Sequence, residues 1–169
     1  LAVGNGNPDS GSTQPNRLYR NASGNLVLAW TSPESDRTAS VAWGDVDGDN
    51  DLDLFVGNGA LEGRPNRLYR NNSGALTLAW TSTEVEDTRS VAWGDYDGDG
   101  DLDLAVGNDG EPNRIYVNNS GPLSRDSISI STETDNTNEA AWGDYDNDGD
   151  LDLAAANWGQ PNRLYRNDD

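Results

Sequence analysis

A near-identical segment recurs three times along the chain, beginning at Ser40, Ser90 and Ala140. The copies read SVAWGDVDGDNDLDLFVGN, SVAWGDYDGDGDLDLAVGN and AAWGDYDNDGDLDLAAAN, and their tryptophans are spaced 50 and then 49 residues apart. Repeats of this length are typical of propeller blades and solenoid units, which bury their apolar faces against neighbouring units. The repeat therefore restricts the chain to architectures built from stacked units of about 50 residues.

Short apolar or alternating stretches predict four β-strands per repeat, named a to d. In the copy that begins at Ser90 they span 91–93, 102–106 and 114–117, and strand d of the preceding copy spans 76–80. Asn-x-Ser-Gly turns between strands c and d begin at Asn21, Asn71 and Asn118. We expect Asn and Gly in these turns to take the positive φ that tight hairpins need. Four short antiparallel strands per repeat indicate an all-β fold of β-propeller blades.

The first and last repeats are incomplete. The chain opens with a stretch that matches strand b, Leu1 to Gly4, and ends after Asn167 without a strand d. The predicted order is bcd-abcd-abcd-abc, about three and a half blades. We expect one repeat domain over residues 1–169, with repeats at about 1–39 (partial), 40–89, 90–138 and 139–169 (partial). Closed propellers have roughly four to eight blades, so unpaired strand edges favour a homo-oligomer, a filament or pairing with other repeats.

Each full copy carries five aspartates in nine residues between strands a and b, in the pattern D-x-D-x-D-x-D-L-D. The three sets are Asp45, Asp47, Asp49, Asp51 and Asp53; Asp95, Asp97, Asp99, Asp101 and Asp103; and Asp144, Asp146, Asp148, Asp150 and Asp152. Such carboxylates repel one another unless a cation neutralises them, and Ca²⁺ accepts six to eight oxygen ligands in flexible geometry. The pattern predicts three Ca²⁺ sites, with solvated acidic loops as the alternative; Mg²⁺ is disfavoured because it prefers few carboxylates.

The spacing matches the first nine positions of an EF-hand loop, in which positions 1, 3 and 5 supply carboxylates and position 7 a backbone carbonyl. Position 12 is Val56, Val106 or Ala155 in place of Glu, which excludes the helix-flanked EF-hand. We therefore expect the Asp at position 9 to complete the ligand set. Positions 4 and 6 should take positive φ. These positions are Gly48 and Asn50, Gly98 and Gly100, and Asn147 and Gly149.

The segment VAWGDYDGDGDLDLAVGN followed by PNRLYRN resembles the FG-GAP/VCBS-type repeat of integrin α-subunit propellers and many secreted bacterial proteins. The resemblance covers essentially the whole chain. It implies that the loop between the first two strands of a blade binds calcium, which we carry to positions 1, 3, 5, 7 and 9 of the three loops. The Phe-Gly pair that names the family is absent, and Gly-Asn at Gly57 and Gly107 replaces its Gly-Ala-Pro element. These departures weaken any transfer of integrin-like ligand recognition.

Composition narrows the function. The formal net charge is −19, which argues against binding to nucleic acid or anionic membranes, and no apolar run is long enough for membrane insertion. Neither Cys nor His is present, and all basic residues are Arg. The chain therefore lacks thiolate chemistry and the commonest general base, and repetition itself disfavours a single active site, so we expect no enzyme activity.

Two further repeated features have structural interpretations. Tryptophans at the same repeat positions are expected to pack between blades, whereas Trp158 has no counterpart in the other repeats and favours either an interface role or a filler role. Asn-Arg pairs recur at Asn16, Asn66, Asn113 and Asn162. We expect each Arg to bridge to a carboxylate or carbonyl of the next blade. The Asn-x-Ser sequences also match the N-glycosylation acceptor pattern, although the turn already requires them.

The favoured hypothesis is a calcium-binding, extracellular structural or adhesive module that self-assembles or completes a propeller with other repeats. A lectin-like propeller that binds a glycan is the alternative, and a protein ligand is also open. A non-catalytic part of a polysaccharide-active enzyme is less favoured. Extracellular or cell-surface location is inferred from calcium, because millimolar levels outside cells suit weak sites of about 10⁻⁴ to 10⁻³ M.

Overall fold

The computed structural model describes residues 2–3, 13–59, 64–120, 123 and 128–168, and in these residues all regular structure is β-strand. Leu1 and Gly4 of the first expected strand lie outside the described residues. The strands are β1 (Ala2–Val3), β2 (Gln14–Ala22), β3 (Asn25–Asp36), β4 (Thr38–Gly44), β5 (Asp53–Asn58), β6 (Arg67–Asn72), β7 (Ala75–Thr81), β8 (Thr88–Gly94), β9 (Asp103–Asn108), β10 (Arg114–Tyr116), β11 (Ile128–Ser129), β12 (Thr137–Gly143), β13 (Asp152–Asn157) and β14 (Arg163–Tyr165).

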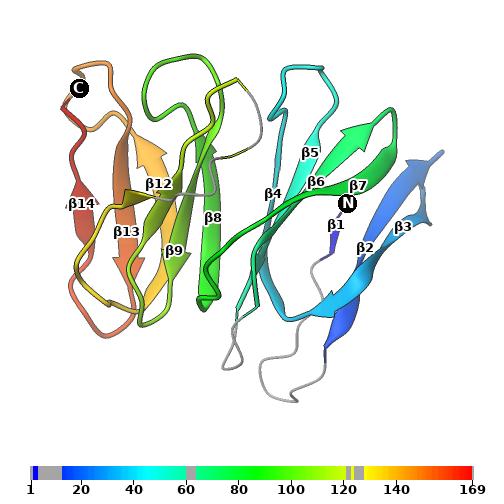
Figure 1. Ribbon diagram of the computed structural model, residues 1–169, viewed down its shortest axis with the longest axis horizontal. Helices are drawn as coiled ribbons and strands as arrows, with labels where there is room; N and C mark the ends of the chain where they lie inside the picture. Colours follow the sequence, from blue (N-terminus) through cyan, green and yellow to red (C-terminus); the bar gives the residue numbers. More distant parts are fainter. Residues whose placement is uncertain (1, 4–12, 60–63, 121–122, 124–127, 169) are drawn as a thin grey trace.

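These strands form four antiparallel sheets in chain order, β1-β2-β3, β4-β5-β6-β7, β8-β9-β10-β11 and β12-β13-β14. The order bcd-abcd-abcd-abc is confirmed strand for strand. Figure 1 shows the four sheets side by side, and the last three contact one another through the a strands β4, β8 and β12. The described residues thus form an open row of propeller-like blades. β1 and β14 lie at free sheet edges, where an a strand and a d strand would pair in a complete blade.

Each sheet has two apolar faces, because alternate residues of a strand point to opposite sides. In β5, Leu54 and Val56 face the preceding sheet, where they pack with Trp30. Phe55 faces the following sheet and clusters with Leu104. All six residues of β5 are buried. The strand is a nearly continuous apolar run that begins with a buried Asp. Inter-sheet packing of these faces forms the core.

Tryptophans of the a strands pack on glycines of the preceding sheet. A Cβ atom built on Gly44 would lie 2.9 Å from the indole nitrogen of Trp93, and one on Gly94 would lie 2.6 Å from Trp142. No atom lies within 4 Å of the same position on Gly143. The expected role of tryptophan between blades is confirmed for Trp30, Trp80, Trp93 and Trp142. Trp43, by contrast, is 36% exposed.

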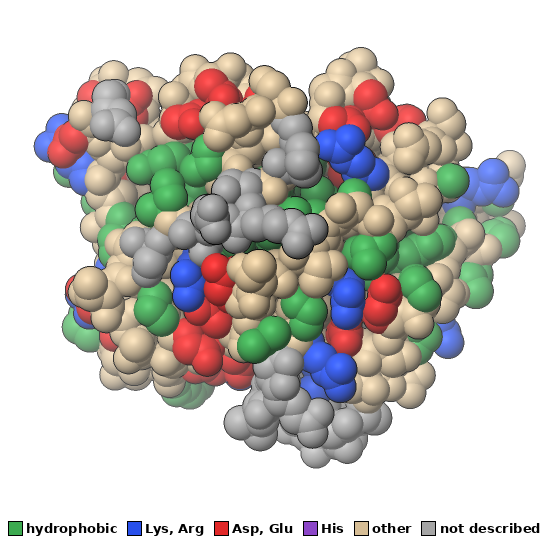
Figure 2. Space-filling view, in the orientation of Figure 1, with side chains coloured by type: hydrophobic (Ala, Val, Ile, Leu, Met, Phe, Trp, Pro, Cys, Tyr) green, Lys and Arg blue, Asp and Glu red, His purple; other side chains and the backbone are tan. Residues whose placement is uncertain are grey.

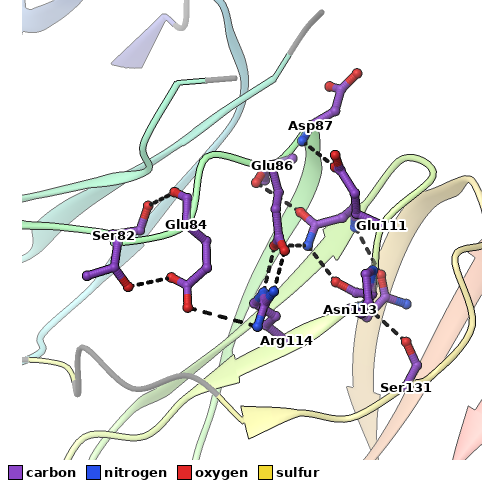
Figure 3. Close-up of polar contacts among 12 residues, drawn as sticks. Ser82, Glu84, Glu86, Asp87, Glu111, Asn113, Arg114 and Ser131 are labelled. Atoms are coloured by element: carbon purple, nitrogen blue, oxygen red, sulfur yellow. Dashed lines mark hydrogen bonds and ion pairs between the residues drawn. The ribbon is translucent and has the colours of Figure 1, made fainter. Parts of the chain in front are cut away.

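The Asn-Arg pairs of the two middle sheets bind residues on both sides, and Figure 3 shows the pair Asn113-Arg114. Arg114 binds Glu86 through two nitrogens, with a distance of 2.7 Å from Nε to Oε2. Asn113 donates from Nδ2 to Oγ1 of Thr137 in the next sheet at 3.0 Å. The expected carboxylate partner of the Arg side chain is confirmed. The expectation that this partner lies in the next blade was wrong. Glu86 lies in the connector from the preceding sheet, and Asp36 and Asp135 hold the equivalent places for Arg67 and Arg163.

The c–d turns differ in detail from the expectation. Ser73 and Gly74 take positive φ, 54° and 96°, as do Ser23 and Gly24. The first Asn of the turn instead accepts a hydrogen bond with its side-chain oxygen. In the second turn, Oδ1 of Asn71 accepts the N–H of Gly74 at 2.8 Å. The expectation of positive φ is confirmed for Gly24 and Gly74 but was wrong for Asn, because the central turn positions are Ser and Gly, and the Ser lies two residues after the first Asn. These bonds account for the Asn-x-Ser-Gly sequence without glycosylation.

Candidate metal centre

The three acidic loops lie along one edge of the row of sheets. They connect β4 to β5, β8 to β9 and β12 to β13, and Figure 1 shows all three along the upper edge of the view. Acidic side chains gather along the same edge in Figure 2. Since each loop joins strands a and b of its sheet, the fold places the three loops at equivalent positions.

Backbone geometry folds each loop around its first aspartate. In the loop 45–53, Oδ1 and Oδ2 of Asp45 accept the N–H groups of Asp49 and Asn50 at 3.1 and 2.9 Å. Positions 4 and 6, Gly48 and Asn50, both have a φ of 71°. Positive φ also occurs at the matching positions of the other loops, at Gly98, Gly100, Asn147 and Gly149. The sequence prediction for these positions is confirmed.

The aspartate at position 9 is buried and clamped by two backbone N–H groups. Oδ2 of Asp103 accepts the N–H of Tyr96 at 2.7 Å, and its Oδ1 accepts the N–H of Asn118 at 2.7 Å. The same pairs of bonds join Asp53 to Val46 and Asn71, and Asp152 to Tyr145 and Asn167. Burial raises the pKa of Asp103 and of Asp53, and the N–H bonds oppose that rise only in part. A cation beside these carboxylates would favour their charged form.

The carboxylates converge in each loop. Oxygens of three residues lie within 4.8 Å of one another: Asp45, Asp47 and Asp53; Asp95, Asp97 and Asp99; and Asp144, Asp146 and Asp152. The first and third loops thus bring together positions 1, 3 and 9, and the middle loop positions 1, 3 and 5. In all three loops the aspartate at position 5 accepts the N–H of position 7, with Asp49 accepting from Asp51, Asp99 from Asp101 and Asp148 from Asp150. The side chain at position 7 points elsewhere in two loops, since Asp51 and Asp101 accept the N–H groups of Ser73 and Ser120.

The donor set fits a hard cation. Ca²⁺–O distances of about 2.3–2.6 Å place ligand oxygens up to about 5 Å apart across the ion, so oxygens that lie within 4.8 Å of one another can share one ion. Among the described residues, Oδ1 of Asp95 and Oδ1 of Asp146 are buried and find no hydrogen-bond donor. A buried carboxylate oxygen without a partner is costly, and a bound cation would remove that cost. These residues would hold Ca²⁺, which would cross-link the loop.

Sequence reasoning missed the arginines beside two of the loops. Arg70 pairs with Asp47 and Arg166 pairs with Asp146, each at 2.9 Å. Among the described residues the middle loop has no such pair, since Val117 stands at that repeat position. The signal was in the sequence, where PNRIYVN replaces PNRLYRN. The middle loop therefore has the least compensated negative charge.

Comparison with known families agrees with this geometry. A family model described as FG-GAP-like repeat matches residues 1–56, 57–106 and 95–155. FG-GAP repeats often bind calcium and are typical of extracellular proteins. No curated protein matches the chain. No helix among the described residues could cross a membrane. Because the matches cover most of the sequence, the chain belongs to the FG-GAP-like repeat family.

Proposed function

We propose that the chain is a calcium-binding, non-catalytic module that serves adhesion or assembly outside the cell. The observation that carries this proposal is the convergence of three carboxylates within 4.8 Å in each of three equivalent loops. A net charge of −19 adds to the attraction for cations. Calcium in these loops would lock strands a and b of each blade together. Millimolar calcium outside cells would fill even weak sites of this kind.

Hydrogen bonds that hold the loop already occupy carboxylate oxygens of the aspartates, which leaves few of these oxygens for catalysis. Asp103 uses both oxygens to accept backbone N–H groups, and Asp101 holds the turn at Ser120. The sequence contains no His, Cys or Lys that could act as base or nucleophile. We therefore infer a binding or structural role for the loops.

Assembly is supported by the outer face of the sheet β12-β13-β14. Ala154, Ala156 and Leu164 are exposed there, and Leu164 is 48% exposed. Their counterparts in the sheet β8-β11, such as Ala105 and Ile115, are at most 1% exposed because the next sheet covers them. Together with the free edges of β1 and β14, this face favours contact with further repeats or with copies of the chain.

The calcium proposal is tested by a titration followed by isothermal calorimetry and thermal unfolding. We expect three sites, and a melting temperature that rises with calcium and falls in chelator. Asp97→Asn removes one carboxylate of the middle cluster and should abolish or weaken one site. Glu139→Gln, an exposed change of the same charge outside the loops, should change neither readout. An unfolding curve that is identical in calcium and chelator would refute the proposal.

Assembly is tested separately by light scattering over a range of protein concentrations, in calcium and then in chelator. We expect a mass above that of one chain, 18.2 kDa, which falls when calcium is removed. A fixed mass above 18.2 kDa at all concentrations would exclude a filament and favour a closed oligomer. A monomer in both conditions would refute self-assembly while leaving the calcium sites in place.

Carbohydrate binding remains the second candidate because of one residue. Trp158 lies in the connection from β13 to β14 and is 72% exposed, a suitable platform for a sugar ring. The Asn-Arg pairs do not support this candidate, because Asn113 and Arg114 are used between sheets. A glycan array in calcium, with Trp158→Ala as the comparison, decides the matter; equal signals from both proteins would exclude this residue as the sugar site.

A further inference from the structure

The three acidic loops are joined by two asparagines. Nδ2 of Asn118 donates to the carbonyl of Val46 at 2.9 Å, and Nδ2 of Asn167 donates to the carbonyl of Tyr96 at 2.9 Å. Val46 and Tyr96 hold position 2 of the first and middle loops. Each asparagine comes from the sheet that follows, so each bond crosses from one repeat to the next. Asn118 is fully buried and Asn167 is 8% exposed.

The backbone N–H and the side-chain amide of each asparagine donate to two different acidic loops. The backbone N–H of Asn118 donates to Asp103, position 9 of the middle loop, while its side chain reaches position 2 of the first loop. Asn167 does the same between Asp152 of the third loop and Tyr96 of the middle loop. Position 2 in turn donates its own N–H to position 9 of its loop, as Tyr96 does to Asp103. The hydrogen bonds thus form one continuous chain through all three loops.

We propose that Asn118 and Asn167 couple the three loops, so that they bind calcium cooperatively. This inference rests on the proposed calcium function. An ion in the first loop would bind Asp45 and Asp47, which flank Val46 on both sides, and would fix the Val46 carbonyl. The fixed carbonyl holds the Asn118 side chain, and the Asn118 N–H in turn holds Asp103. Asp103 accepts the N–H of Tyr96, the residue between Asp95 and Asp97, so these two carboxylates are held in place for the second ion. The second ion therefore binds a loop that is already ordered, so its binding loses less conformational entropy. This is positive coupling between the two sites.

The repeats supply their own comparison. Asn71 and Asn21 occupy the same repeat position as Asn118 and Asn167. The side chain of Asn71 turns back to the carbonyl of Leu52 in its own sheet, at 3.1 Å, and no D-x-D-x-D loop precedes residue 45 in the sequence. The side-chain oxygen of Asn21 accepts the N–H of Gly24 at 2.8 Å, within its own turn. Coupling is thus expected across two junctions, with the middle loop linked on both sides.

Native mass spectrometry during a calcium titration tests the coupling, because it counts chains with zero, one, two and three ions. Three equal, independent sites would place about three quarters of the chains in the one-ion and two-ion states at half saturation. For the wild type we expect these states to be depleted, with each bridge raising the affinity for the neighbouring ion about 5-fold or more. In Asn118→Ala and Asn167→Ala the intermediate states should reappear, and the double variant should approach the independent distribution. Asn21→Ala should behave as the wild type.

The outcomes separate the two proposals. If no ion binds at millimolar calcium, the calcium function itself fails. If three ions bind in independent proportions to the wild type, calcium binding stands and the coupling is refuted. Depletion that persists in the double variant would also refute the role of the asparagines. Should loss of the buried Asn118 prevent folding, as judged by circular dichroism, Asn167→Ala and the wild-type distribution decide the question alone.

Discussion

Adding one methyl group at the glycine that follows the a-strand tryptophan should have opposite effects in two neighbouring repeats. In Gly94→Ala the new Cβ would lie 2.6 Å from Cδ1 of Trp142, well inside the usual contact of about 3.5–4.0 Å between carbons. Trp142 cannot swing away without cost, because its indole N–H donates to the carbonyl of Ala92 at 3.1 Å. Overpacking of this kind costs about 1–3 kcal/mol, against about 0.5–1 kcal/mol gained from the stiffer backbone.

Gly143→Ala is the matched control, since nothing lies within 4 Å of its Cβ position. It keeps the backbone gain of about 0.5–1 kcal/mol without the clash. The two variants should therefore differ by about 1–3 kcal/mol, or about 2–12 °C in melting temperature for a chain of this size. Thermal and urea unfolding in saturating calcium measure the gap. Equal destabilisation by both variants would refute the reasoning, because it would mean that the glycine is needed for its backbone or that both faces are covered.

Three further results are expected. Arg114→Ala should destabilise the chain by about 2 kcal/mol in urea unfolding, because Glu86 loses a charge-assisted partner, whereas a change within 0.5 kcal/mol would show the clamp to be redundant. Val117→Arg should weaken calcium binding at the middle loop, by analogy with Arg70, and calorimetry should show one weakened site; unchanged affinities would show that these arginines do not compete with the ion. The raised pKa of Asp103 means that, without calcium, this residue contributes stability at acidic pH that is lost as the pH rises through its folded pKa. Protons must leave before calcium binds, so the calcium-induced rise in melting temperature should shrink as the pH falls towards the raised pKa of Asp103, and a constant rise would contradict this assignment.

The repeat made much of the fold predictable. Strand order follows from local alternation of apolar and polar residues and from turn residues, and both signals were repeated three times. The positive φ at Gly98 and Gly100 followed from the same local logic, because a nine-residue loop with five acidic side chains must turn sharply. The direction of the arginine clamp was not predictable, since Glu86 and Asp135 look like ordinary acidic residues of a connector.

The sequence by itself determined the repeat unit, the strand order and the three acidic loops, because these depend on neighbours within about 50 residues of chain. Only the tertiary structure decided which groups meet between repeats. It buried Asn118 against the loop of another repeat, joined to Val46 across 72 positions of sequence. It also left Gly143 open while Gly94 is covered. Identical residues thus acquire different roles, because their environment depends on whether another sheet packs against them.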